Sequence, residues 1–498
     1  MSTIARNIAA NAAGSGVVVV VFLVAIPLYL RLVGPEAYGL VGLFTTLMAA
    51  ATALDLGLGA TLNREVARMT ARPVGPGESA DIPSTLQASS WVVGLLAAVL
   101  FGALAPPIAV RWLNLSALSP ADIRSALTLM AAALPAVVAR SVHLAGLNGL
   151  QRQPLANLVQ ATGSVARAAL TVTALNVVGP TLTVFFVTQG LLLYVEALAL
   201  RTAFRRALPA AARAGRIRPG ALRGLVRFSS GMAATMLLGF ALTSMDQIVL
   251  SAILPLAELG YYTVAVAVAG GLGQIVYPVT TAVYPRFSQL IERADPSPVS
   301  TEYHFFSQLV AVVVLPLGAV LIVFPDHVLG LWTRDPDVVR HAAVVLSLRA
   351  LGTTLNTLMY VPHVLQLASG WSTLGAGVNA AAVAVVLPLT IVLSLAVGAP
   401  GAALAWIGLN VGILLLAMGR MHRRVLPGEL GRWYAQLLSP TLAVAGVAVV
   451  ARAVMTDGLS APARLGWLAV TVGVSAAAAL AVAPTVRRRL AAAALRSA

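Results

Sequence analysis

Seven ionisable side chains interrupt apolar segments of this 498-residue sequence that are long enough to cross a membrane. They are three arginines, three carboxylates and one histidine: Arg140, Arg167, Arg349, Asp55, Glu196, Asp246 and His143. A charge at the centre of a bilayer costs about 2.5–3.5 kcal/mol on insertion scales. Such residues are therefore expected to pair with each other, to contact a substrate or to carry an ion.

The arginines are the candidates for binding an anion. A guanidinium is a permanent cation with a planar fork that matches phosphate oxygens. Arg140 and Arg167 lie deep in their segments, and together with Arg349 they could hold a phosphate-bearing anion in a water-filled cavity. An internal ion pair with Glu196 or Asp55 explains either deep arginine equally well. Arg349 lies nearer the outer end of its segment, where it could simply extend to the headgroups.

The other four residues are candidates for ion coupling or for pairing between the two lobes that the sequence predicts (below): Asp55, Glu196, Asp246 and His143. Asp246 could accept a proton or Na+, although pairing with an arginine is favoured. Asp55 lies close to Arg64 near a helix end, which favours a local pairing. His143 follows Arg140 by three residues, so both share one helix face. A proton relay is one interpretation of His143, and a packing histidine is the favoured one.

The elements that must position these residues are membrane-spanning helices. The sequence is 59% hydrophobic and 10% charged, against about 45–50% and about 25% in soluble domains. A spanning helix needs about 20 mostly apolar residues. Such segments predict about 14 spans, near 8–30, 38–59, 86–106, 125–148, 155–176, 180–200, 229–251, 257–281, 304–325, 341–366, 372–394, 400–419, 435–454 and 463–484.

The arginine distribution predicts the orientation, because cytoplasmic loops carry an excess of positive charge. With the N-terminus inside, 23 arginines fall on the cytoplasmic side, seven on the outer side and three within spans, and 23 + 7 + 3 accounts for all 33 basic residues. We therefore expect both termini in the cytoplasm of a bacterial cell, in its inner membrane.

A basic connector at 201–227 separates two groups of six spans. The segment Leu32–Leu40 (LVGPEAYGL) after span one resembles Leu254–Tyr262 (LPLAELGYY) after span seven, with Gly39 matching Gly260. An even number of spans in each half predicts a parallel repeat about an axis along the membrane normal. The predicted organisation is all-α: a lobe at 1–227, a second at 228–431, and two further helices with a basic tail at 432–498.

Several kinds of chemistry are excluded or unsupported. The sequence has no cysteine, which excludes thiolate metal sites and disulfides, and it has neither a phosphate-binding Gly-x-x-x-x-Gly-Lys loop nor a His-Glu-x-x-His motif. We expect no cofactor, no metal and no catalytic residues. The net charge of +16 lies in short loops rather than on a soluble face, so nucleic acid is not an expected partner.

Several motifs resemble those of one transporter family. They are Pro27–Leu40 (PLYLRLVGPEAYGL), Asp55–Gly59 (DLGLG), Gly146–Arg152 (GLNGLQR) and Met245–Tyr262 (MDQIVLSAILPLAELGYY). They resemble polysaccharide (O-antigen type) flippases of the multidrug/oligosaccharidyl-lipid/polysaccharide (MOP) exporter superfamily. The resemblance implies a two-lobed bundle that alternates between inward- and outward-open states. It also implies a polyprenyl-diphosphate-linked sugar as cargo, and a polysaccharide polymerase and other assembly proteins among the partners.

The sequence thus favours a non-enzymatic flippase for a lipid-linked oligosaccharide, with H+ or Na+ coupling as one energy source. Two alternatives stay open. A multidrug extruder of the same superfamily would need an acidic cavity for cationic drugs, which the deep arginines disfavour. A membrane glycosyltransferase or polymerase would need a larger loop bearing carboxylates. The longest outer loop, 107–124, has Asp122 as its only acidic residue.

Overall fold

The computed structural model describes residues 3–53, 55, 57–71, 78–222, 226–292, 296–456 and 458–497, which are almost entirely helical and contain no strand. Arg72, Arg223 and Arg293, which contribute to the predicted orientation, lie outside these residues. The chain divides into two compact units, residues 1–260 and 261–498.

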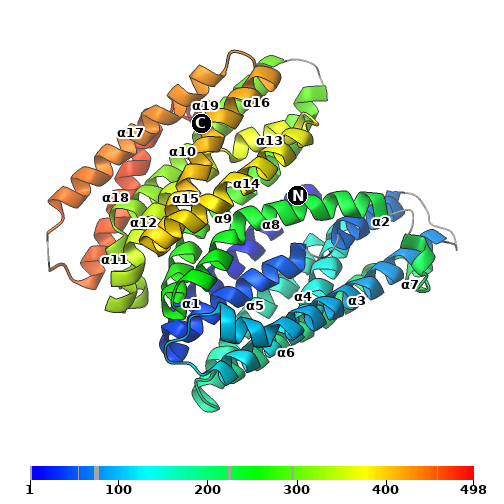
Figure 1. The fold of residues 1–498 in the computed structure, drawn as a ribbon. Coiled ribbons are helices and arrows are strands. Elements are labelled where there is room, and N and C mark those ends of the chain that lie inside the picture. Colours follow the sequence, from blue (N-terminus) through cyan, green and yellow to red (C-terminus); the bar gives the residue numbers. More distant parts are fainter. Residues whose placement is uncertain are drawn as a thin grey trace. The chain divides into compact units, whose positions relative to one another are not determined.

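The helices of the first unit are α1 (Thr3–Ala53), α2 (Leu58–Ala71), α3 (Glu78–Pro107), η1 (Ile108–Trp112), α4 (Pro120–Gly149), α5 (Gln153–Val177), α6 (Leu182–Ala207), α7 (Ala210–Arg213), η2 (Pro219–Leu222) and α8 (Val226–Ile253) (Figure 1). Those that follow are α9 (Leu256–Glu292), α10 (Pro296–Val323), α11 (Pro325–Thr333), α12 (Pro336–Leu358), α13 (Tyr360–Ala368), α14 (Ser372–Val397), α15 (Ala399–Gly412), η3 (Ile413–Ala417), α16 (Met418–Val425), α17 (Leu430–Val454), α18 (Ala461–Ala481) and α19 (Pro484–Ser497).

Thirteen helical stretches in the described residues are long and apolar enough to cross a membrane, which agrees with about 14 predicted spans. The two counts differ at α1, because the first two predicted spans belong to one helical stretch, Gly16–Ala53. Gly34 interrupts it with φ 82° and ψ 167°, a conformation that glycine adopts without strain. The chain therefore bends between two spans at the Gly34–Pro35 step.

Local sequence explains where the helices begin. Ser119 precedes α4 and accepts a hydrogen bond from the Asp122 N–H at 3.1 Å, with Pro120 in the first turn. Thr181 caps α6 by accepting from Val184 N–H. A hydroxyl at this position satisfies an N–H that has no partner within the helix.

In the first unit α4 is the central element, packed against α2, α3 and α6, while α5 packs against α1 and α6. The predicted span at 125–148 contains two ionisable residues, Arg140 and His143. The structure buries much of α4 between its neighbours, so its polar residues are sheltered by protein rather than by lipid.

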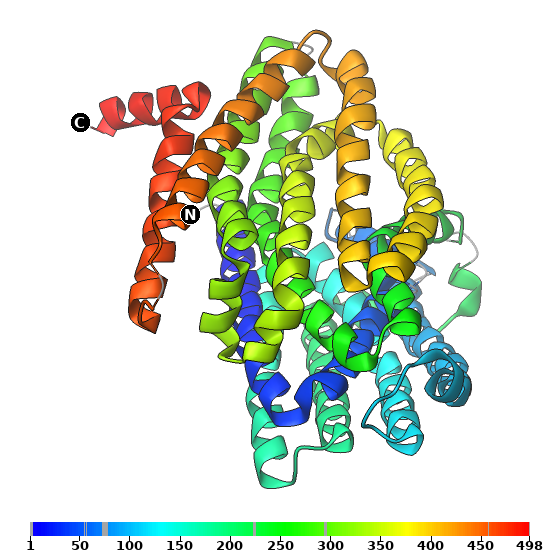
Figure 2. The same ribbon diagram turned by 60° about the vertical axis from the view of Figure 1, so that its left-hand side comes forward.

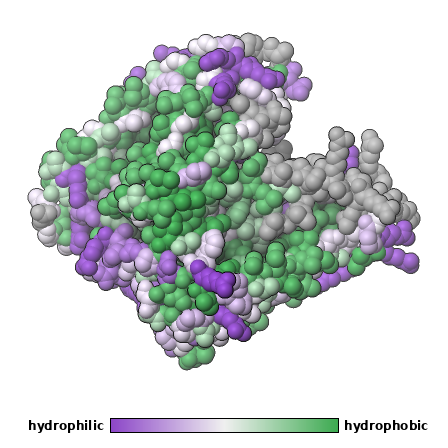
Figure 3. Space-filling model, in the orientation of Figure 1, coloured by the Kyte–Doolittle hydropathy of each residue, from purple (hydrophilic) through white to green (hydrophobic). Residues whose placement is uncertain are grey.

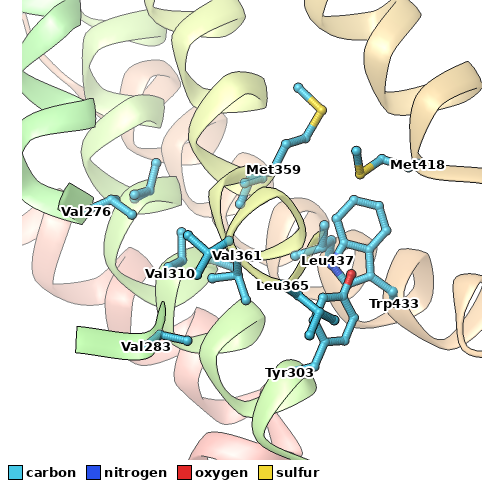
Figure 4. Close-up of a cluster of buried hydrophobic side chains, with 14 of the residues drawn as sticks. Val276, Val283, Tyr303, Val310, Met359, Val361, Leu365, Met418, Trp433 and Leu437 are labelled. Carbon is cyan, nitrogen blue, oxygen red and sulfur yellow. The ribbon is translucent and has the colours of Figure 1, made fainter. Parts of the chain in front are cut away.

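In the second unit α10 packs against α12, α17 and α18, and α15 packs against α12 and α14. A buried hydrophobic cluster in this unit includes Val310, Val361, Leu365, Trp433 and Leu437 (Figure 4). The short helix α19 turns away from α18 at the end of the chain (Figure 2). Arg489 of α19 binds both carboxylate oxygens of Glu302 at 2.6 and 2.8 Å.

The first unit extends beyond the connector at 201–227, because α8 packs against α1 and α2. The predicted lobes at 1–227 and 228–431 are defined by sequence repetition rather than by packing, so they stay a prediction. On the face shown in Figure 3, hydrophobic residues cover broad areas and hydrophilic residues gather toward the margins.

Candidate functional site

Glu196 of α6 lies between Arg140 of α4 and Arg167 of α5. The Arg140 Nε donates to Glu196 Oε1 at 2.6 Å, and Arg167 Nη1 donates to Glu196 Oε2. The Glu196 side chain is only 1% exposed, whereas those of Arg140 and Arg167 are 22% and 16% exposed. Three of the seven predicted residues therefore form one cluster, in which the carboxylate is buried and the guanidinium groups retain accessible surface.

The cluster lies near the middle of all three helices. Arg140 is nine residues from the end of α4, Arg167 is 14 residues from the start of α5, and Glu196 is 14 residues from the start of α6. At 1.5 Å per residue, these separations correspond to roughly 14–21 Å along the helix axes. Ionised groups at such depth normally face the interior of the bundle or a water-filled space.

The charges of the cluster do not balance. Two arginines and one glutamate leave a net charge of +1, and the described residues place no second carboxylate within ion-pair distance of either guanidinium. Arg140 also donates from Nη2 to Gln160 Oε1 at 3.3 Å, and Arg167 from Nη2 to Ser164 Oγ at 3.4 Å. Each guanidinium carries five N–H donors, so several remain available to an anion.

Small and neutral polar residues surround the ion pairs of Glu196. A Cβ atom added to Gly163 would lie 2.9 Å from the Glu196 carboxyl carbon, so glycine at this position allows α5 to approach α6. Nearby, Gln189 donates to Tyr29 Oη and to Thr171 Oγ1, both at 3.3 Å. The cluster therefore has a lining of neutral polar groups that can accept or donate further hydrogen bonds.

The structure places the other two candidates of the first half outside this cluster. The buried Asp55 accepts hydrogen bonds from the Gly57 and Gly59 N–H groups at 2.8 and 3.3 Å, at the start of α2. His143 is fully buried and packs against Phe204 of α6, with ring centroids 6.4 Å apart. Asp55 thus stabilises a helix end, and His143 faces the same helix as Arg140.

Asp246 and Arg349 lie in different units. Asp246 is buried in α8 and accepts from the Gln247 N–H at 2.8 Å, while the Gln247 side chain contacts Thr46 of α1. Arg349 is 6% exposed in α12, and its guanidinium lies over the Trp406 ring at 4.4 Å. Their roles in ion coupling and substrate contact stay predictions.

The sequence analysis missed Glu36, which follows the bend in α1. Its carboxylate accepts from the N–H groups of Ser116, Ala117 and Leu118 at 2.7, 2.7 and 3.3 Å. The same loop contacts the start of α9, because the Leu256 N–H donates to the Asn114 carbonyl at 3.0 Å. An acidic residue directly after Gly34-Pro35 was the available signal, but the partners of Glu36 are backbone groups with no sequence signature.

Gly39 and Gly260, which the repeat analysis matched to each other, lie at one close helix crossing. A Cβ on Gly39 would lie 2.1 Å from the Leu256 carbonyl oxygen, and a Cβ on Gly260 would lie 2.2 Å from that of Pro35. We call residues 34–39, 113–118 and 254–260, which meet here, the loop clasp. It joins elements that the sequence assigns to different repeats.

Family models and solved structures identify the fold. The family model for polysaccharide biosynthesis proteins matches residues 4–291, and the MatE family model matches residues 232–392. Curated protein sequences give no significant match.

Similar solved structures include the lipid II flippase MurJ in an inward closed conformation. It has a TM-score of 0.71 and 12% sequence identity, and the match covers 95% of this chain and 98% of that one. An inward-facing multidrug resistance MATE family transporter of the MOP superfamily matches with a TM-score of 0.65 and 15% identity, over 82% of this chain and 96% of that one. The likeness to both supports a multi-pass membrane protein with the MOP fold. Because the first family model covers more than half of the chain, the protein belongs to the polysaccharide biosynthesis protein family, within the MOP superfamily of transporters and flippases.

Proposed function

We propose that the protein is a flippase that moves a polyprenyl-diphosphate-linked oligosaccharide across the bacterial cytoplasmic membrane by alternating access. The observation that carries this proposal is the Arg140–Glu196–Arg167 cluster, with its net charge of +1 and its partly exposed guanidinium groups well inside α4 and α5. A purely structural ion pair needs one cation for one carboxylate. The second cation is accounted for by a polyanionic cargo.

In this mechanism Glu196 holds both guanidinium groups in place, and their remaining N–H donors bind phosphate oxygens of the cargo. Bidentate guanidinium–phosphate contacts are strong and directional. The sugar occupies the wetter space around the diphosphate, and the polyprenyl chain stays in lipid. Both chain termini face the cytoplasm, and the loop clasp lies on the outer side.

The second candidate is a multidrug antiporter. The MatE match over residues 232–392 and the likeness to MATE transporters favour it. Such a transporter would bind cationic drugs, which a cluster of net positive charge repels. The buried carboxylate of Asp246 in α8 is the group that would serve it.

One experiment separates the two. Purified protein is reconstituted into liposomes with a fluorescent polyprenyl-diphosphate oligosaccharide, and the fraction of sugar headgroups accessible to an external reagent is followed over time. A parallel set of liposomes receives a cationic dye and a proton or Na+ gradient. We expect headgroup movement and no gradient-driven dye uptake. Dye transport without sugar movement would replace the flippase by the antiporter.

A further inference from the structure

The first unit contains an apolar groove that the proposed transport mechanism does not use. Its volume is about 510 Å³, and it lies between the second half of α1, the end of α3 with η1, and α8. Its lining on α1 is Leu43, Thr46, Leu47 and Ala50, and on α3 and η1 it includes Phe101, Leu104, Ile108 and Arg111. These residues recur every three to four positions, so each set forms a stripe along one helix face.

The groove is elongated. From Phe101 to Arg111 the stripe spans ten residues, or roughly 15 Å along the helix axis. Pockets of about 300–1,000 Å³ commonly hold small-molecule ligands, and 510 Å³ falls in this range. The shape and the lining suit a hydrocarbon chain that lies parallel to the helices.

One end of the groove is cationic. Arg111 is the only ionisable residue of its lining, and it makes no ion pair with any residue that the structure describes. Next to it, the Trp112 Nε1 donates to Ser251 Oγ at 2.9 Å and ties η1 to α8. Tryptophan and arginine at a helix end are typical of the membrane–water interface. The groove therefore runs from an apolar interior to an unneutralised cation at headgroup level.

The flank of the groove is open to the bilayer. The part of α3 beside it exposes Leu96, Val99 and Leu100 by 64–65%, and all three lie in the candidate span Ala80–Trp112. A lipid can therefore enter the groove by lateral diffusion without crossing water. A soluble ligand would have to cross hydrocarbon or pass the Trp112–Ser251 contact.

We propose that this groove binds a phospholipid with an anionic headgroup. One acyl chain lies along the α1, α3 and α8 walls, and the lipid phosphate contacts the Arg111 guanidinium. A guanidinium is a permanent cation whose planar fork matches phosphate oxygens, so Arg111 suits an anionic headgroup at this end of the groove. Because the three walls come from separate helices, a bound lipid stabilises their packing by mass action.

The test uses fluorescence quenching of Trp112 by lipids that carry bromine on an acyl chain. The protein is placed in phosphatidylcholine nanodiscs, and brominated phosphatidylglycerol or brominated phosphatidylcholine is added in increasing mole fraction. The signal of Trp112 is the difference between the wild type and Trp112→Phe. We expect half-maximal quenching at a mole fraction of phosphatidylglycerol at least fivefold lower than that of phosphatidylcholine.

Two pairs of variants locate the site. Arg111→Gln removes the cation and should abolish the preference for phosphatidylglycerol, whereas Arg124→Gln, an exposed arginine of α4 outside the groove, should keep it. Ala50→Phe fills the groove and should weaken quenching by both lipids, and Ala49→Phe, whose exposed side chain lies outside the lining, should not. Elution from size-exclusion chromatography at the wild-type volume shows that each variant is folded.

Three results would overturn the proposal. The first is equal quenching by the two lipids in the wild type. The second is an unchanged preference in Arg111→Gln, which keeps the proposal falsifiable even if Ala50→Phe fails to fold. The third is displacement of phosphatidylglycerol by a polyprenyl phosphate at a much lower mole fraction, which would assign the groove to the carrier lipid. None of these results depends on sugar transport, so the proposed function is tested separately.

Discussion

Replacing Glu196 by glutamine should destabilise the first unit more than removing either of its arginine partners. The wild-type cluster carries +1, Glu196→Gln carries +2, and Arg140→Gln carries 0. Removing one partner of a buried pair typically costs about 3–5 kcal/mol, because the other charge is stranded. Glu196 is 1% exposed and its partners are 16–22% exposed, so the buried estimate applies at its lower end, about 3 kcal/mol.

The assay is thermal unfolding in detergent, together with the amount of protein in the membrane. At about 2–4 °C per kcal/mol for a domain of this size, Glu196→Gln should lower Tm by on the order of 10 °C. Arg140→Gln and Arg167→Gln leave a neutral pair and should each lower it by less than half as much. The double variant Arg140→Gln/Arg167→Gln strands the carboxylate and should resemble Glu196→Gln.

Equal Tm values for Glu196→Gln and Arg140→Gln would refute this reasoning, because they would show that the carboxylate does not hold both cations. A matched control is Glu258→Gln, an acidic residue in the first turn of α9 that lies outside the cluster. When Glu258→Gln is combined with each cluster variant, the Tm difference between Glu196→Gln and Arg140→Gln should stay unchanged.

Three further predictions concern other parts of the chain. Glu36→Gln should cost about 1.5–3 kcal/mol, because one charged hydrogen bond to the 116–118 loop is lost, and faster hydrogen exchange confined to that loop would report it. Burial raises the pKa of Glu429, but hydrogen bonds from Ser300 and His304 outweigh it and leave the pKa below its ordinary value. The stabilisation from Glu429 should therefore be present above about pH 4.3 and be lost as the pH falls further; an identical acid unfolding profile for Glu429→Gln would contradict this. Reporter fusions after residues 215 and 428 should read cytoplasmic and one after 118 periplasmic, and a periplasmic reading at 215 would reverse the orientation.

The sequence predicted the helices well because a spanning segment is a local property. A run of about 20 apolar residues is sufficient to identify one, and the predicted bounds of α5 and α18 agree with the structure within three residues at each end. The bend at Gly34 was also visible, since Gly-Pro after an apolar run favours a turn. Assigning α8 to the first compact unit could not be predicted, because it depends on contacts with α1, about 200 residues earlier.

The candidate site was predicted in part. Arg140, Arg167 and Glu196 all stood out as charges inside apolar segments, and an ion pair with Glu196 was one of the explanations. Glu196 lies 56 and 29 residues from its two partners, so the pairing depends on how α4, α5 and α6 are rotated about their axes. Hydropathy does not determine that rotation, and it therefore could not choose among the partners.

Other polar contacts left no signal in the sequence. Glu36 binds backbone N–H groups, which every residue type carries. Arg111 contributed only one charge to the orientation count, and its position at the end of an apolar groove follows from three helices packing together.

The central claim, that the excess cation of the Glu196 cluster binds the diphosphate of the cargo, is tested most directly by headgroup movement in liposomes containing Arg140 variants. Arg140→Lys keeps the charge and loses the guanidinium fork, and Arg140→Ala loses both. At equal amounts of reconstituted, folded protein, the flipping rate should fall in the order wild type, Arg140→Lys, Arg140→Ala. The alanine variant should lose about tenfold or more, as expected for one charged hydrogen bond of about 1.5–3 kcal/mol. Wild-type flipping by Arg140→Ala would contradict the account and place the diphosphate site elsewhere.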